Sequence, residues 1–377
     1  MSAALTNLHF RLEDVGNSRT TRRHPASIPR TLDTPIVNTQ ASMSSVVSTT
    51  PPKPGTHPEP SANDSPQLSK KAIHFLQQAI EDPSTWIAGP YAILLQLANP
   101  RLARGVSLHS NFAKQGHAIS RFLRTAAFVV AVTHGTPAQR DAVVNVVKKQ
   151  HSRVRGSWKG NETGSLGASA SAKEGDHIRI HEYDARDAEL QKWTAATLFV
   201  SMRKGRTTFN FDRGKVIGMR DRQEMELLMK GFGIFAQVLD MPWEKWFRDL
   251  DEFERYFERE MKRLVTCRNG GVDEESEKIG RLMMFELGLP WWLGWVVMPV
   301  VRLAMASWLP GVLRDAYGLE DPGRSWILMG CYAWFVWVVR VVNWGMPGVV
   351  RRLLTGGMVA FMARAVRDVE KNGRWMI

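Results

Sequence analysis

Two helices joined by a tight turn are predicted between Arg121 and Gly156, and this segment constrains the fold more than any other part of the chain. The second helix has a well-marked start, because Thr136 is a good N-cap and Pro137 occupies the first helical position. Gln139 follows the cap by three residues and completes a capping box. Gly156 is expected to end the helix. The segment therefore predicts a helical hairpin.

Polar side chains interrupt the apolar faces of both predicted helices. In the second helix one face carries Val144, Val147, His151 and Val154. In the first helix one face carries Arg121, Thr125, Phe128 and Val132. An inward histidine beside an arginine and a threonine could line a cofactor pocket. The alternative is structural: His151 is then a hydrogen-bonded core residue, Arg121 is ion-paired, and Thr125 bonds back to its own helix. Helical spacing alone leaves both interpretations open.

The chain is long enough for two average domains, but its composition predicts one domain behind a disordered leader. Residues 1–69 are rich in Ser, Thr and Pro and cannot bury enough apolar surface to offset the entropy of ordering. They contain no apolar run of the kind found in secretory signals, and Glu13 and Asp14 argue against a transit peptide. Residues 70–377 are predicted to form the domain, with 157–176 as a flexible internal loop. We expect an intracellular protein.

The net charge of +13 raises the question of an anionic partner. The basic residues are scattered, and no recognisable nucleic-acid-binding motif accompanies them, so we expect no nucleic-acid partner. Anionic lipid headgroups are a partner that fits a basic surface as well as nucleic acid does, or better. The two cysteines, Cys267 and Cys331, lie in settings that favour neither a metal cluster nor a thiolate-ligated haem. Gly-rich phosphate loops, HExxH and GxSxG are absent from the sequence.

Two apolar, tryptophan-rich runs occupy the C-terminal third, at 289–309 and 326–350. Arg340 and Asn343 leave only 326–339 uninterrupted in the second run, which is shorter than the roughly 20 residues that a membrane span needs. Buried core helices are the default prediction for runs of this length. The alternative is peripheral membrane contact, through a surface that dips into the bilayer at the ER or another membrane.

Strand-like alternation is nearly absent from the rest of the chain. Residues 219–239 and 244–264 have the spacing of helices that cover a core, and 177–181 is short and ambiguous. The predicted fold class is therefore all-α, a multi-helix bundle with a pocket between facing helices.

Several motifs occur in an order that resembles a known family. They are the blocks Gly89–Phe112, Arg121–Thr125 (RFLRT), His134–Pro137 (HGTP), His151–Gly156 (HSRVRG) and Tyr183–Leu198, with a weaker match at Leu309–Leu319. Together they resemble the catalytic domain shared by ER-bound oxygenases of the mycophenolic-acid pathway type (MpaB) and the rubber oxygenases, or latex-clearing proteins. The resemblance covers most of residues 73–367.

This resemblance implies an all-helical fold that encloses haem b, with His151 as the proximal iron ligand. It places Arg121 and Thr125 in the haem pocket and Arg124 on the distal side, so that these three residues are the candidate catalytic residues. It further implies an oxidoreductase of secondary metabolism that uses O2 on an apolar substrate, such as an isoprenoid or lipid-like compound. A neutral imidazole can bind iron, and guanidinium groups suit haem propionates.

The chain departs from the family pattern at two positions. Asn99 and Ala195 stand where family members commonly have histidine (LAHP and WVHATL). Asn99 can still cap the helix that begins after it, whereas Ala195 can neither bind metal nor move a proton. Residues 100–140 contain no carboxylate that could serve as the base of the latex-clearing proteins. His109 and His117 are the nearest alternatives, and we expect both to be surface or capping residues.

These departures leave a second functional hypothesis open. The chain could be a non-catalytic haem-binding or membrane-associated scaffold protein that has kept the fold and lost the chemistry.

Overall fold

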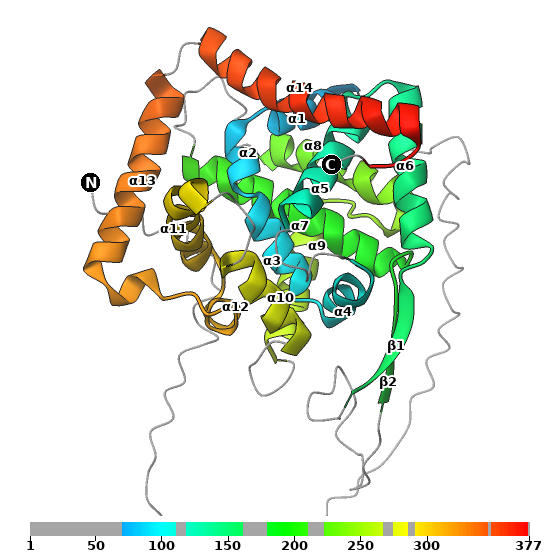
Figure 1. The fold of residues 1–377 in the computed structure, drawn as a ribbon, viewed down its shortest axis with the longest axis horizontal. Coiled ribbons are helices and arrows are strands. Elements are labelled where there is room, and N and C mark those ends of the chain that lie inside the picture. The colour runs from blue at the N-terminus through cyan, green and yellow to red at the C-terminus, as the bar shows by residue number, and fades with distance from the viewer. Residues whose placement is uncertain are drawn as a thin grey trace, which may run out of the picture. The chain divides into compact units, whose positions relative to one another are not determined.

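The computed structural model describes residues 70–110, 118–160, 179–209, 222–266, 274–285, 291–345 and 348–375. The predicted leader, residues 1–69, and residues 161–176 of the predicted loop lie outside these ranges. The described helices are α1 (Lys70–Ile80), α2 (Pro83–Ile87), α3 (Gly89–Leu97), α4 (Pro100–His109), α5 (Ala118–His134), α6 (Pro137–His151), α7 (Ala188–Phe209), α8 (Arg222–Gln237), α9 (Leu250–Thr266), α10 (Glu274–Phe285), α11 (Trp291–Trp308), α12 (Gly311–Ala316), α13 (Trp326–Gly345) and α14 (Gly348–Asn372) (Figure 1). The prediction of an all-α multi-helix bundle is confirmed.

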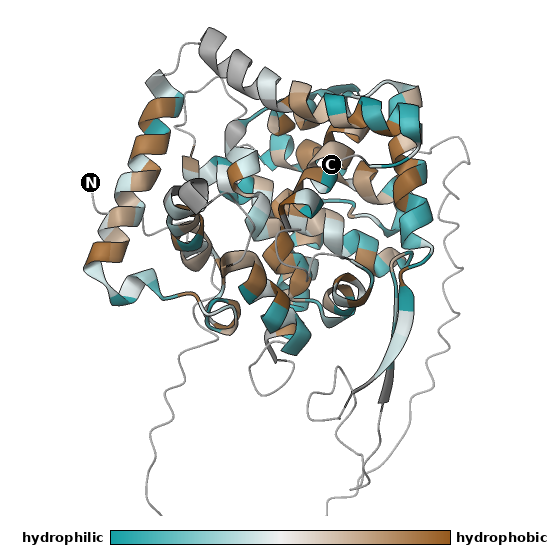
Figure 2. Ribbon diagram, in the orientation of Figure 1, coloured by the Kyte–Doolittle hydropathy of each residue, from teal (hydrophilic) through white to brown (hydrophobic). Residues whose placement is uncertain are grey.

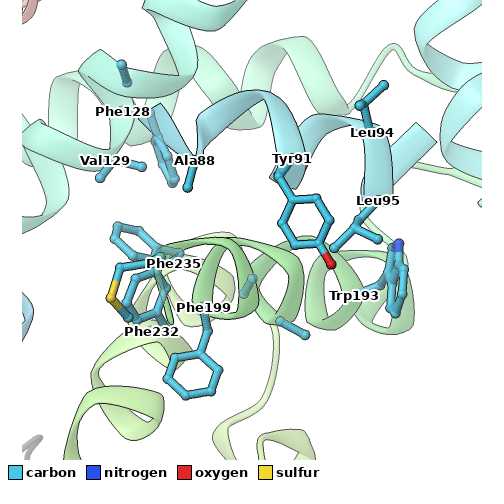
Figure 3. Close-up of a cluster of buried hydrophobic side chains, with 14 of the residues drawn as sticks. Ala88, Tyr91, Leu94, Leu95, Phe128, Val129, Trp193, Phe199, Phe232 and Phe235 are labelled. Atoms are coloured by element: carbon cyan, nitrogen blue, oxygen red, sulfur yellow. The ribbon is translucent and has the colours of Figure 1, made fainter. Parts of the chain in front are cut away.

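Helix α7 runs through the core and packs against α2, α3 and α8. Figure 3 shows Trp193 and Phe199 of α7 among side chains from α3, α5 and α8. The Phe199 ring lies edge-on to Phe253 of α9, with centroids 4.9 Å apart. Buried aromatic pairs in this geometry add to the hydrophobic stabilisation that burial alone provides. The core therefore gathers around α7, and the family-like block that begins at Tyr183 leads into it.

The weakly matching block at Leu309–Leu319 is tied to the core by one tyrosine. Tyr317 is fully buried, and its hydroxyl donates a hydrogen bond to the carbonyl oxygen of Leu94 at 2.9 Å. A Cβ atom at Gly280 would lie 2.3 Å from the Tyr317 ring, so only glycine allows α10 to approach this side chain. The hydrogen bond satisfies the buried hydroxyl, which would otherwise be costly to bury.

Both helix starts predicted from the sequence are confirmed. The Gln139 amide donates to Thr136 Oγ1 at 3.3 Å and the Thr136 amide donates to Gln139 Oε1 at 3.1 Å, which makes the reciprocal capping box of α6. Asn99 Oδ1 accepts a hydrogen bond from the Arg101 amide at 3.0 Å and caps α4. These contacts are local, which is why the sequence reveals them.

A β-hairpin corrects two of the predictions. Helix α6 ends at His151, and Gly156 lies in strand β1 (Arg155–Gly160), which pairs antiparallel with β2 (Arg179–Asp184) (Figure 1). Gly156 faces Tyr183 in the register, and a Cβ atom there would lie 2.6 Å from the tyrosine hydroxyl oxygen. The glycine thus makes room for a cross-strand ring rather than ending a helix. The first residues of the predicted loop, 157–160, are strand.

The two apolar C-terminal runs behave differently. In α11 the second half is buried, including Ala304, Met305 and Trp308, so the core-helix prediction is confirmed for that half, whereas Trp295 in the first half is 80% exposed. In α13 no described residue is buried, although the helix is apolar along its length (Figure 2). The core-helix prediction is therefore wrong for α13. Among the described residues, α13 is the one helix long and apolar enough to cross a membrane by length and composition.

Candidate functional site

Helices α5 and α6 pack against each other and both contact α14. The predicted apolar faces are buried in part: Phe128, Val132 and Val144 are each less than a tenth exposed, whereas Thr125, Val147, His151 and Val154 are partly exposed and Arg121 is exposed. Val147 packs against the same core. The hairpin predicted from the sequence therefore exists, and its capping box fixes where α6 begins and hence where His151, its last residue, lies.

His151 is a half-buried, neutral histidine. Burial, assisted by the nearby Arg121 guanidinium and opposed by the Asp184 carboxylate, lowers the pKa of its imidazole to about 4. The ring is therefore uncharged at neutral pH, with one nitrogen lone pair available. Its Nδ1 atom is buried and has no hydrogen-bond partner in the part of the chain that the structure describes. A buried nitrogen without a partner is costly unless a ligand satisfies it.

Arg121 lies in the first turns of α5 and interacts electrostatically with His151. Its side chain is accessible, yet the protein atoms around it lower the pKa of its guanidinium by desolvation, and the nearby Arg124 lowers it further. The group nevertheless stays protonated at neutral pH. Among the described residues Arg121 forms no side-chain hydrogen bond or ion pair. Within the described ranges the ion-paired alternative for Arg121 is therefore not seen.

Thr125 and Arg124 are both less exposed than Arg121, and Thr125 is hydrogen-bonded to its own helix. The Thr125 hydroxyl donates a hydrogen bond to the Arg121 carbonyl oxygen at 3.1 Å, one helical turn earlier. This is the structural alternative considered for the threonine, and it commits the hydroxyl proton to the backbone. Arg124 is half-buried. The structure thus places Arg121, Arg124 and Thr125 on adjacent turns at the start of α5, and it brings Arg121 near His151.

Asp184 is a residue near the site that the sequence analysis missed. It ends strand β2 and acts electrostatically on His151. Its carboxylate accepts hydrogen bonds from the amide and the guanidinium of Arg186, which hold its pKa below the usual range. It therefore carries a negative charge at neutral pH. The hairpin brings it to His151 from a distant part of the chain, so only its place inside the Tyr183–Leu198 block hinted at a role.

His109, considered as an alternative proton carrier, has a structural partner. Its Nε2 atom lies 3.0 Å from the hydroxyl oxygen of Tyr183, which is buried, and the two rings meet edge to face. The contact joins the end of α4 to the β-hairpin. His117 lies outside the described residues.

Both positions that depart from the family pattern, Asn99 and Ala195, have identifiable structural roles or locations. Asn99 caps α4, and Ala195 is 2% exposed within α7. In the described ranges no group of three or more His, Cys, Asp or Glu side chains could hold a metal ion. Cys331 is exposed on α13, and Cys267 lies outside those ranges. Any metal bound at His151 would therefore need most of its ligands from elsewhere.

The comparison with protein families gives one match. The sequence model of the family described as ER-bound oxygenase mpaB/B'/rubber oxygenase, catalytic domain, matches residues 77–341. No curated protein and no solved structure matches the chain. The matched range runs from α1 to α13 and includes α5, α6 and the hairpin that surrounds His151. Because it covers well over half of the sequence, the chain belongs to this oxygenase catalytic-domain family.

Proposed function

We propose that this member of the oxygenase family is a haem-b-dependent oxygenase in which His151 is the protein ligand to iron. The observation that carries the proposal is a neutral imidazole whose buried Nδ1 atom has no hydrogen-bond partner among the described residues, close to the Arg121 guanidinium. The proposed reaction uses O2 on an apolar substrate, isoprenoid or lipid-like, by oxidative cleavage of a carbon–carbon double bond or a related oxidation. The proposed location is intracellular, peripheral to the ER or another membrane.

The donor set favours haem over a bare metal ion. A structural or catalytic metal ion usually needs three or four protein ligands, and the described residues offer no such group. Haem brings four nitrogen ligands of its own and needs one histidine from the protein. A neutral imidazole, with its pKa lowered to about 4, can supply that ligand over the whole physiological pH range. The residues around His151 therefore fit haem.

The basic residues at the start of α5 fit the anionic propionate edge of haem. Arg121 is accessible to solvent, and the nearby protein atoms and Arg124 lower the pKa of its guanidinium. The repulsion between Arg121 and Arg124 would be relieved by a carboxylate, and haem carries two propionates. Thr125 holds the Arg121 backbone through its hydroxyl, so it acts as a positioning residue.

Bound haem would supply the binding and activation of O2 at iron. The chain would contribute the ligand nitrogen of His151, the positive charge of Arg121 and Arg124, and the apolar side chains of α5 and α6. Asp184, ionised, would offset part of the positive charge that Arg121 places near the imidazole. These contributions are binding, orientation and exclusion of water.

The test is the absorption spectrum of protein purified from haemin-supplemented cells. The variants are His151→Ala and, as a matched control, His74→Ala, which removes an exposed histidine from α1. The parent and His74→Ala should show a Soret band, and His151→Ala should lose it. A normal Soret band in His151→Ala would overturn the ligand assignment. A haem-loaded parent that leaves prenylated lipids and polyisoprene unchanged under O2 and a reductant would favour the scaffold alternative instead.

A further inference from the structure

Helix α13 attaches to the body of the protein through one of its faces. Its side chains Tyr332, Phe335, Val336 and Val339 pack against the core. Polar groups on the same side also find partners: Arg340 Nε donates to the Thr208 carbonyl oxygen at 2.6 Å, and Asn343 Nδ2 donates to the Phe209 carbonyl oxygen at 3.4 Å. The Tyr332 hydroxyl accepts a hydrogen bond from Trp308 Nε1 at 2.8 Å.

The opposite side of α13 is exposed and carries no charged residue. We call this surface the outer face of α13, and its large side chains are Trp326 (85% exposed), Ile327 (55%), Met329 (51%), Trp334 (66%), Trp337 (58%), Val342 (49%) and Trp344 (54%). Helix α13 lies at one edge of the bundle, where hydrophobic turns alternate with paler ones along its length (Figure 2).

The outer face of α13 does not have the composition of a helix surface that faces water. A helix at a protein–water boundary normally places its charged and polar residues outward and its apolar residues inward. In α13 the arrangement is the reverse, because the arginine, the asparagine and the tyrosine hydroxyl point to partners in the body while tryptophans point outward. Large contiguous apolar surfaces of this kind mark interaction sites.

We propose that the outer face of α13 is a membrane-docking surface that inserts into one leaflet of an anionic bilayer. Tryptophan is enriched where protein meets the membrane interface, and the outer face carries one at each end of the helix and two in between. Arg324, exposed just before α13 begins, suits contact with lipid phosphates. The inference rests on the peripheral membrane location proposed above and names its surface; because that surface involves none of the proposed haem ligands, it can fail while the haem assignment stands.

The packing of α13 favours an orientation parallel to the membrane. A helix of this length, about 30 Å, could cross the hydrocarbon core. Its inner face, however, is bonded to the end of α7 and to α11, so a crossing would carry those elements into the bilayer. Lying in the plane of the interface, α13 can bury its outer face in lipid while its inner contacts remain intact.

The charge of the chain favours lipid over a second copy as the occupant of this surface. Two copies would each carry a net charge of +13 and would repel one another. A leaflet that contains phosphatidylserine or phosphatidylinositol attracts the same charge. The basic chain and the uncharged tryptophan surface together fit an anionic membrane.

The experiment is flotation of the full-length protein with phosphatidylcholine vesicles that contain about 30% phosphatidylserine. The double variant Trp334→Glu/Trp337→Glu places two charges on the outer face without touching the packed side. Leu108→Glu is the matched control, because Leu108 is 64% exposed on α4. We expect the parent and Leu108→Glu to float, and the double variant to lose affinity by about tenfold or more.

Three outcomes would overturn the proposal. They are a parent that does not float, a double variant that floats like the parent, and a parent that sediments as a dimer which the double variant dissociates. Brominated lipids give a second readout, since they quench tryptophan within the acyl region. Fluorescence of Trp334 should be quenched, and the difference between the parent and Trp334→Phe isolates its signal. Circular dichroism of each variant confirms that it is folded.

Discussion

The lowered pKa of His151 makes the stability of the haem-free protein depend on pH in a specific way. The unfolded chain binds a proton on this imidazole near its ordinary pKa of 6.5, whereas the folded protein does so only near pH 4. Above pH 6.5 both states are neutral at this position and pH has no effect through it. As the pH falls from 6.5 towards 4, protons bind preferentially to the unfolded chain, and folding stability is lost.

The size of this loss follows from the same shift. Each pKa unit is worth about 1.36 kcal/mol, so the folded state should lose about 2 kcal/mol between about pH 7 and about pH 4.5 through His151. Urea unfolding of the parent and of His151→Gln at both pH values measures it. Glutamine is polar and does not titrate, so the parent should lose about 2 kcal/mol more than the variant. Equal losses in the two proteins would refute the assignment of a desolvated, neutral His151 imidazole.

Further substitutions test the packing around the site. Gly280→Ala should cost about 3 kcal/mol or prevent folding, because its Cβ atom would overlap the fully buried Tyr317 ring; an unchanged urea midpoint would contradict this. Thr136→Ala should cost about 1 kcal/mol by removing the cap of α6, and Thr136→Ser, measured in the same urea titration, should recover most of it. Asp82→Ala should cost about 3–5 kcal/mol, since it removes both the N-cap of α2 and the ion partner of the buried Arg206 guanidinium; a loss below about 1 kcal/mol in urea unfolding would contradict both roles.

What could be predicted from the sequence is mainly local. The cap at Asn99 and the capping box at Thr136 depend on contacts within three residues, and both are present as expected. The buried stripe of α5 and α6 follows from helical spacing, and its helices are confirmed. The proposed role of His151 came from the family resemblance, because spacing alone could not distinguish a ligand from an ordinary core histidine.

What could not be predicted depends on distant parts of the chain. The β-hairpin pairs Gly156 with Tyr183 across an intervening segment, and neither strand has a clear alternating pattern. The same pairing brings Asp184 to His151, which no local pattern reveals. Helix α13 was expected in the core because its composition is that of a core helix. Composition does not say whether other elements cover a helix, and in the structure none of its described residues is buried.

The most direct test of the central claim is the visible absorption spectrum of the parent and His151→Ala, oxidised and dithionite-reduced, after expression with haemin. The account predicts a Soret band that shifts on reduction in the parent and is lost in the variant, while both proteins remain helical by circular dichroism. A parent that folds but shows no Soret band, or a variant that retains it, would contradict the claim that His151 holds haem in this oxygenase.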